Sequence, residues 1–126
     1  MLLERLEFAA EPAQVRRVRA WVRERLTAVK EVPDEILADV VLIAGELAAN
    51  AVAHGTGPVR ALLTCADSAV WIGVEDAGGT AWLDPAAPKV APVGTGLTLV
   101  AACSRRRGQF HRRDGGRTVW AEIPIA

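Results

Sequence analysis

The N-terminal part of the chain shows two hydrophobic patterns. Residues 3–8 have the length of a short edge strand, and the strand ends before Pro12. From Pro12 to about residue 30, hydrophobic residues recur at steps of three and four positions, which is the period of an amphipathic helix. The helical stripe consists of Val15, Val18, Val22, Leu26 and Val29. We therefore expect an edge strand followed by a helix that buries this stripe.

A second, more apolar helix is predicted from residues 33–34 to His54. It begins with Pro and Asp, which favour the first positions of a helix, and glycines follow its end. Hydrophobic residues fill a wide arc of the helical wheel, which predicts a buried face. Glu46 and Asn50 are four positions apart, so they lie on one side of the helix, at the border of that arc.

Alternating positions after the second helix predict two hairpins. Residues 59–65 and 70–76 are separated by a short polar turn, and each segment has one apolar face. Asp76 falls on the apolar face of its strand, so we expect it at the rim of the core. Residues 108–113 and 117–125 flank a turn rich in glycine and predict the final hairpin.

The segment between the hairpins has a different character. Residues 77–93 contain glycines and prolines and show no period, which is typical of a lid or binding loop. Gly94 then opens a helix that we expect to run to about Ser104. Helices and antiparallel hairpins are thus grouped and do not strictly alternate. This grouping favours an α+β fold, with one sheet and helices on one face, over a doubly wound parallel sheet.

Composition fits one globular domain, residues 1–126, with 51% hydrophobic and 24% charged residues. The 15 basic and 15 acidic residues cancel, which argues against a general nucleic-acid binder. The apolar runs predict no membrane span, and the first residues do not resemble a secretory signal. Cys65 and Cys103 are isolated thiols, so we expect small core residues in a reducing cytoplasm, not zinc ligands.

Two polar positions near the core are candidates for chemistry, and each also has a structural explanation. Glu46 and Asn50 would together hold a water and a metal ion, or they would form a solvated polar stripe. Asp76 would accept a hydrogen bond from the amino group of a planar heterocycle, or it would form an Asx turn at the end of its strand.

Two further segments suggest anion binding. Residues 94–97, Gly-Thr-Gly-Leu, precede a helix, where backbone N–H groups favour an anion, but they lack the spacing and lysine of a Walker A loop. A cluster of arginines would bind phosphate or an acidic surface, or would protect a strand edge from aggregation. The cluster consists of Arg105, Arg106, Arg107, Arg112 and Arg113.

The order and spacing of these features resemble the GHKL ATPases. Residues 46–55 (ELAANAVAHG) resemble the N box of that superfamily, and residues 75–79 (EDAGG) resemble its first glycine box. Residues 94–100 (GTGLTLV) resemble the second glycine box, and residues 116–124 (GRTVWAEIP) resemble the closing strand. Within the superfamily, the chain is most similar to the anti-sigma-factor serine/threonine kinase branch, from about residue 13 to residue 124.

This resemblance implies a two-layer α/β sandwich of the Bergerat type that binds ATP and Mg²⁺. By position, Asn50 would coordinate Mg²⁺, Asp76 would accept a hydrogen bond from the adenine amino group, and Thr118 would support adenine. Glu46 would act as the general base toward an attacking serine hydroxyl. Residues 77–93 would be the ATP lid. The other residues implied to line the nucleotide are Gly78, Gly94, Thr95, Gly96 and Leu97.

The resemblance also implies a function and partners. The chain would be a cytoplasmic protein kinase that restrains a sigma factor and phosphorylates a serine of an antagonist protein, without direct contact with nucleic acid or membrane. A homodimer is left open. Thr80 stands where the family has a glycine, and Lys89 is the only cation of the expected lid. The alternative function is therefore an ATP-binding switch without phosphoryl transfer.

Overall fold

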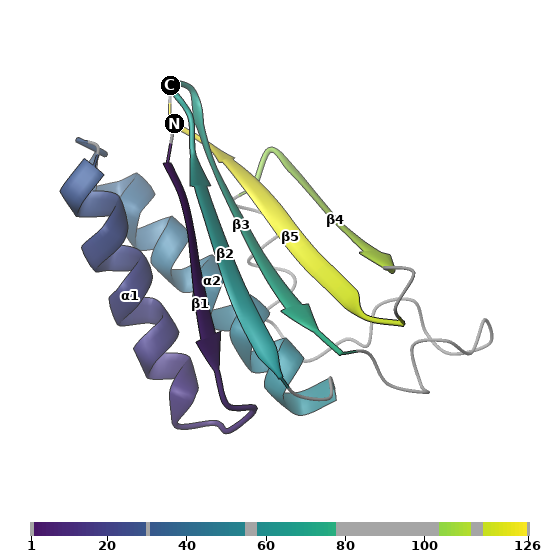
Figure 1. The fold of residues 1–126 in the computed structure, drawn as a ribbon. Coiled ribbons are helices and arrows are strands. Elements are labelled where there is room, and N and C mark those ends of the chain that lie inside the picture. The colour runs from purple at the N-terminus through teal and green to yellow at the C-terminus, as the bar shows by residue number, and fades with distance from the viewer. Residues whose placement is uncertain (1, 30, 55–57, 78–103, 112–114, 126) are drawn as a thin grey trace.

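The computed structural model describes residues 2–29, 31–54, 58–77, 104–111 and 115–125, which form one sheet and two helices (Figure 1). The strands are β1 (Leu2–Phe8), β2 (Val59–Cys65), β3 (Ala69–Asp76), β4 (Arg106–His111) and β5 (Arg117–Pro124). The helices are α1 (Gln14–Val29) and α2 (Asp34–His54). Neighbouring strands are antiparallel in the order β1-β2-β3-β5-β4, and both helices cover one face. The expected two-layer α+β sandwich is confirmed.

The two helices bury the stripes that their periods predicted. In α1, Val15, Val18, Val22 and Leu26 are all buried, while the side chain of Val29 lies outside the described part of the chain. In α2 the buried residues of the core are Val40, Val41, Ile43, Ala44, Leu47, Ala48 and Ala51. Asp34 and Glu35 lie in the first turn of α2, where negative charge interacts favourably with the helix dipole.

The hydropathy of α2 is explained by its place in the core. By length and composition alone, its residues Asp34–Ala53 would pass for a membrane span, with a mean hydropathy of 1.8. Half of that window is buried inside the structure, and α2 packs against α1, β2, β3 and β5. Burial against these elements accounts for the apolar composition of α2.

The sheet follows the predicted alternation closely. The inner-face residues Val59, Ala61 and Leu63 of β2, and Val70, Ile72 and Val74 of β3, are at most 1% exposed. Cys65 is buried, as expected, whereas Cys103 lies outside the described residues. So do the helix expected from Gly94 and the expected lid, apart from Ala77.

The final hairpin begins earlier than predicted. β4 starts at Arg106 and not at Gly108, because Arg106 still lies opposite Glu122 of β5 in the ladder. The backbone N–H of Arg105 donates to the Glu122 carbonyl at 2.7 Å and so continues the pairing. Arg106 and Arg107 show no apolar alternation, so the sequence pattern does not predict these first residues of β4.

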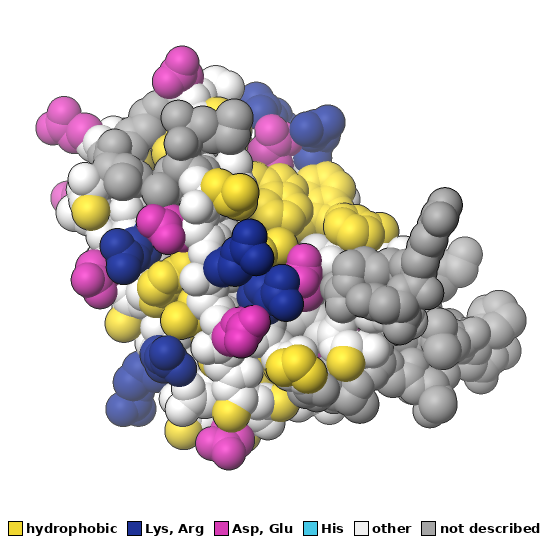
Figure 2. Space-filling view, in the orientation of Figure 1, with side chains coloured by type: hydrophobic (Ala, Val, Ile, Leu, Met, Phe, Trp, Pro, Cys, Tyr) yellow, Lys and Arg dark blue, Asp and Glu magenta, His cyan; other side chains and the backbone are white. Residues whose placement is uncertain are grey.

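The outer face of the sheet, opposite the helices, carries two stacked tryptophans. The rings of Trp71 and Trp120 have centroids 6.3 Å apart and planes inclined by 22°. Gly73 and Gly108 are the cross-strand neighbours of Trp120 and leave room for the two rings. Phe110 lies on the same face and is 49% exposed. Figure 2 shows hydrophobic side chains gathered here, with basic and acidic side chains beside them.

Candidate functional site

A buried ion pair joins the end of β3 to the start of β5. Asp76 is the last residue of β3 and lies directly opposite Arg117, the first residue of β5. The Arg117 Nη2 donates to Asp76 Oδ2 at 3.0 Å, and the two side chains are 0% and 1% exposed. Both follow the alternation of Val74 and Val119, so they point toward the helix layer. The expected burial of Asp76 is confirmed, with a partner that the sequence analysis did not select.

The two charges of this pair depend on each other. Burial lowers the pKa of Arg117 from its ordinary value, while the charge of Asp76 and its hydrogen bond oppose that shift. A guanidinium nevertheless stays protonated in proteins, so Arg117 compensates the carboxylate. Removing one partner of a buried pair leaves an uncompensated charge and typically costs about 3–5 kcal/mol.

Thr118 lies on the opposite face of the sheet from Asp76. Its cross-strand neighbour is Glu75, and its side chain is buried beneath the outer face. Because successive side chains of a strand alternate, Glu75 and Thr118 share one face while Asp76 and Arg117 share the other. The register therefore brings Arg117, and not Thr118, beside Asp76. The closing-strand motif contains both Arg117 and Thr118. Only the pairing register shows which of the two lies on the same face as Asp76.

The last turns of α2 lie at the same end of the sheet as the ion pair. The helix ends at His54, and β2 begins shortly afterwards. Arg60, near the start of β2, pairs with Glu75, which precedes Asp76. α2 thus ends near the sheet end where β3 ends and β5 begins (Figure 1), and Asn50 is one helical turn before the end of α2.

Asn50 is a buried polar residue with an unused hydrogen-bonding atom. Its side chain is 5% exposed, and Oδ1 is buried without a hydrogen-bond partner in the described part of the chain. Leaving such an acceptor unsatisfied costs about 1–3 kcal/mol, so its presence needs an explanation. An amide oxygen is a ligand type that Mg²⁺ accepts, and this residue fits the metal role that the resemblance implies.

Glu46 lies one turn before Asn50 on α2. It is partly exposed, whereas its neighbour Leu47 is buried, so the predicted position at the border of the apolar face is confirmed. The described residues contain no group of three or more His, Cys, Asp or Glu that would hold a metal. Mg²⁺ usually takes one or two protein ligands together with waters and phosphate oxygens, so this finding is compatible with Mg²⁺. The predicted residues Gly78, Gly94, Thr95, Gly96 and Leu97 lie outside the described part of the chain.

The arginine cluster lies in part on an edge strand and is in part neutralised. Arg105 Nη2 and Arg106 Nε donate to the two carboxylate oxygens of Glu122 at 3.0 and 2.6 Å. These hydrogen bonds lower the pKa of Glu122 below its ordinary value. β4 is the outermost strand beside β5, where charged residues discourage pairing with other chains. Arg112 and Arg113 lie outside the described residues.

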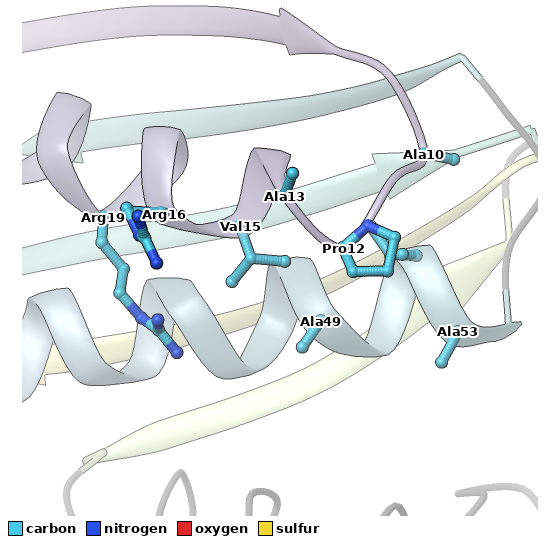
Figure 3. Close-up of a pocket in the computed structure, with 9 residues that line it drawn as sticks. Ala10, Pro12, Ala13, Val15, Arg16, Arg19, Ala49 and Ala53 are labelled. Atoms are coloured by element: carbon cyan, nitrogen blue, oxygen red, sulfur yellow. The ribbon is translucent and has the colours of Figure 1, made fainter.

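A groove of about 650 Å³ is lined by residues of α1, of α2 and of the segment that precedes α1 (Figure 3). It is lined by Ala10, Pro12, Ala13, Val15, Arg16, Arg19, Ala49, Val52 and Ala53. Small apolar side chains form most of its lining, and Arg16 and Arg19 lie together at one end. Among the described residues, the groove lining does not include the selected site residues Glu46, Asn50, Asp76 and Thr118.

The fold and the site together define a class of protein. An antiparallel sheet covered on one face by two helices carries a buried carboxylate at a strand end and a buried asparagine at the end of the second helix. The sequence matches the model of the histidine kinase-like ATPase domain over residues 8–123. The chain belongs to this family of histidine kinase-like ATPase domains.

A solved structure shares the fold. The crystal structure of the RsbU and RsbW domains of Rv1364c from Mycobacterium tuberculosis superposes with a TM-score of 0.73 at 23% sequence identity. The match covers 98% of this chain and 32% of that chain, so this chain spans about a third of the length of its neighbour. The comparison with curated proteins gives no match.

Proposed function

We propose that this chain binds ATP with Mg²⁺ and acts as an anti-sigma-factor-like protein serine/threonine kinase. Membership of the histidine kinase-like ATPase family supports nucleotide binding. The observation that carries the proposal is the buried Oδ1 of Asn50, which has no hydrogen-bond partner among the described residues and lies at the sheet end that carries Asp76. A bound Mg²⁺ would satisfy that oxygen and so explain why the chain tolerates it.

The proposed site residues form two groups. One group would bind the adenine base of ATP, and the other would bind Mg²⁺ and the phosphates. Asp76 would accept a hydrogen bond from the adenine amino group, and Asn50 would hold Mg²⁺ through its amide oxygen. When bound, Mg²⁺ would neutralise phosphate charge. Residues 94–97 would bind phosphate oxygens through backbone N–H groups, and Gly78 would lie near the base.

Glu46 is the residue that we assign to catalysis. Its carboxylate would take the proton of a serine hydroxyl on a protein substrate. The serine oxygen would then form a bond to the γ-phosphorus while the bond from that phosphorus to the bridging oxygen breaks, with ADP leaving. Partial exposure of Glu46 on α2 suits this role, because a protein substrate must reach the carboxylate.

We further propose a sigma factor and an antagonist protein as partners, in the cytoplasm and without direct contact with nucleic acid. The RsbW domain in the structural neighbour supports this assignment. Phosphorylation of the antagonist serine would change which partner the chain holds. The outer sheet face, with Trp71, Trp120 and the half-exposed Phe110, is the surface that we assign to a homodimer. Sedimentation equilibrium would test that assembly.

The experiment for the kinase is transfer from γ-labelled ATP to the antagonist protein. We expect label on a serine of the antagonist, and a loss of about 10²- to 10⁴-fold in rate in Glu46→Ala, with ATP affinity little changed. Glu24→Ala, an exposed glutamate on α1, is the matched control and should label at the wild-type rate. A Glu46→Ala variant that labels at the wild-type rate would remove Glu46 from catalysis.

A second candidate function is an ATP-binding switch that changes partner affinity without phosphoryl transfer. Two features of the sequence favour it: Thr80 stands at a family glycine position, and Lys89 is the only cation of the expected lid. Wild-type protein that binds Mg-ATP but never labels its antagonist would select this function over the kinase.

A further inference from the structure

The ion pair at the sheet end presents an acceptor and a donor side by side. Asp76 offers carboxylate oxygens, and Arg117 offers only N–H groups. The donor nitrogen and the acceptor oxygen are 3.0 Å apart, and the side chains are almost completely buried. Both residues are held by backbone pairing of β3 with β5, so the guanidinium has a fixed place relative to the carboxylate.

This arrangement is the complement of one edge of adenine. The adenine amino group is a donor, and the adjacent ring nitrogen N1 is an acceptor. A carboxylate facing the amino group leaves N1 beside it, and a guanidinium next to that carboxylate can donate to N1. Arg117 Nη2 donates to Asp76 Oδ2, and the planar guanidinium carries its N–H donors in a fixed fork beside that oxygen. Guanine and hypoxanthine present a carbonyl and an N–H at these two atoms, which reverses the pattern.

We propose that Arg117 is a specificity-determining residue of the nucleotide site and that it donates a hydrogen bond to N1 of a 6-aminopurine held by Asp76. The inference rests on the proposed function, which places the amino group on Asp76. It assigns the second contact with the nucleobase to Arg117, where the resemblance to the GHKL ATPases implies Thr118. Asp76 and Arg117 together would reject 6-oxopurines at two adjacent atoms, because each buried group would then face a group of its own kind.

The first test uses wild-type protein and nucleotides that differ by one atom. Binding of ATP, 1-deaza-ATP and 7-deaza-ATP would be measured by isothermal titration calorimetry in the presence of Mg²⁺. We expect 1-deaza-ATP to bind about 10- to 150-fold more weakly than ATP, since a hydrogen bond from a charged group is lost, and 7-deaza-ATP to bind like ATP. Equal binding of ATP and 1-deaza-ATP, or a penalty only for 7-deaza-ATP, would overturn the assignment.

The second test links the lost atom to the residue. Arg117→Met should bind ATP and 1-deaza-ATP with the same reduced affinity, whereas Arg106→Met, an exposed arginine on β4, should keep the wild-type penalty. Arg117→Lys keeps the charge opposite Asp76 and replaces the methionine variant if that variant does not fold. It should reduce the 1-deaza penalty, because an ammonium cannot reproduce the guanidinium geometry.

The outcomes separate this inference from the proposed function. ATP binding without a 1-deaza penalty overturns the role of Arg117 and leaves the proposed function standing. An Arg117→Met variant that retains the full penalty does the same. Wild-type protein that binds neither ATP nor its analogues overturns both.

Discussion

Asn50 and Asp76 show two ways in which a buried polar side chain is accommodated. Asp76 has its charge compensated by Arg117 at 3.0 Å, so it contributes to the fold as well as to the proposed site. Asn50 has an amide oxygen that no described residue satisfies. A substitution of Asp76 should therefore destabilise the protein, whereas the native Asn50 itself lowers the stability of the fold.

Replacing Asn50 should separate stability from function. Asn50→Leu removes the unsatisfied oxygen, so we expect the free energy of unfolding to rise by about 1 kcal/mol. The same variant should lose the effect of Mg²⁺ on ATP binding. Urea denaturation and calorimetry check the two parts. A loss of more than about 2 kcal/mol in stability would show that Oδ1 is satisfied in the folded protein.

Replacing Asp76 should do the opposite and disturb the fold. Asp76→Asn leaves the Arg117 cation buried without its counter-charge, so we expect a loss of about 3–5 kcal/mol in the free energy of unfolding. The double variant Asp76→Asn with Arg117→Met should recover much of this loss, because no charge is left buried. A single variant as stable as the wild type would mean that the pair is open to solvent. Effects of Asp76→Asn on ATP binding must therefore be measured on folded protein.

At the scale of elements, the glycines beneath the tryptophan pair set the packing of the outer sheet face. A Cβ on Gly73 would lie 2.5 Å from Cη2 of Trp71, and one on Gly108 would lie 3.1 Å from the nearest Trp120 ring atom. A rigid ring has little freedom to move aside. We expect Gly73→Ala to destabilise the protein by about 1–3 kcal/mol and Gly108→Ala by less. Urea denaturation and near-ultraviolet circular dichroism of the tryptophans measure both; equal stability of the two variants would contradict the prediction.

The contact between β4 and β5 gives a prediction for pH. Hydrogen bonds from Arg106 and Arg105 lower the pKa of Glu122 in the folded state. The stabilisation that the Glu122 carboxylate gives to the fold is therefore present above the pKa of Glu122 in the unfolded chain. It disappears as the pH falls through the pKa of Glu122 in the folded protein. The arginines are exposed, so Glu122→Gln should cost at most about 1 kcal/mol at neutral pH. The difference between variant and wild type should vanish as the pH drops well below about 4; a difference independent of pH would point to packing instead.

The hydrophobic period predicted most of these elements, and the predictions that were wrong or missing have physical causes. The stripe of α1 and the inner faces of β2 and β3 are strongly periodic, and the structure places them where the pattern did. The predicted β4 begins too late, because Arg106 and Arg107 show no apolar alternation that would indicate a strand. Arg117 escaped selection because a charged residue at the start of a strand gives no sign that it is buried. Only the pairing register of β3 with β5 shows that Arg117 lies opposite Asp76.

At the scale of the whole molecule, the topology gathers the site from distant segments. α2 ends, β3 ends and β5 begins at one end of the sheet (Figure 1), and Asn50, Asp76 and Arg117 are residues of these three element ends. The opposite face of the sheet carries the tryptophan pair, so the surface assigned to a homodimer is separate from the nucleotide site. With the two surfaces separate, the proposed nucleotide site and the proposed homodimer surface would not compete.

Titration calorimetry of wild-type protein with ATP, in Mg²⁺ and in EDTA, tests the central claim most directly. We expect saturable binding at one site that is tighter in Mg²⁺ than in EDTA, and no such difference in Asn50→Leu. Arg16→Leu, in the separate groove of the helix layer, should behave like the wild type. Absence of ATP binding in Mg²⁺, or a magnesium effect that survives in Asn50→Leu, would contradict the account.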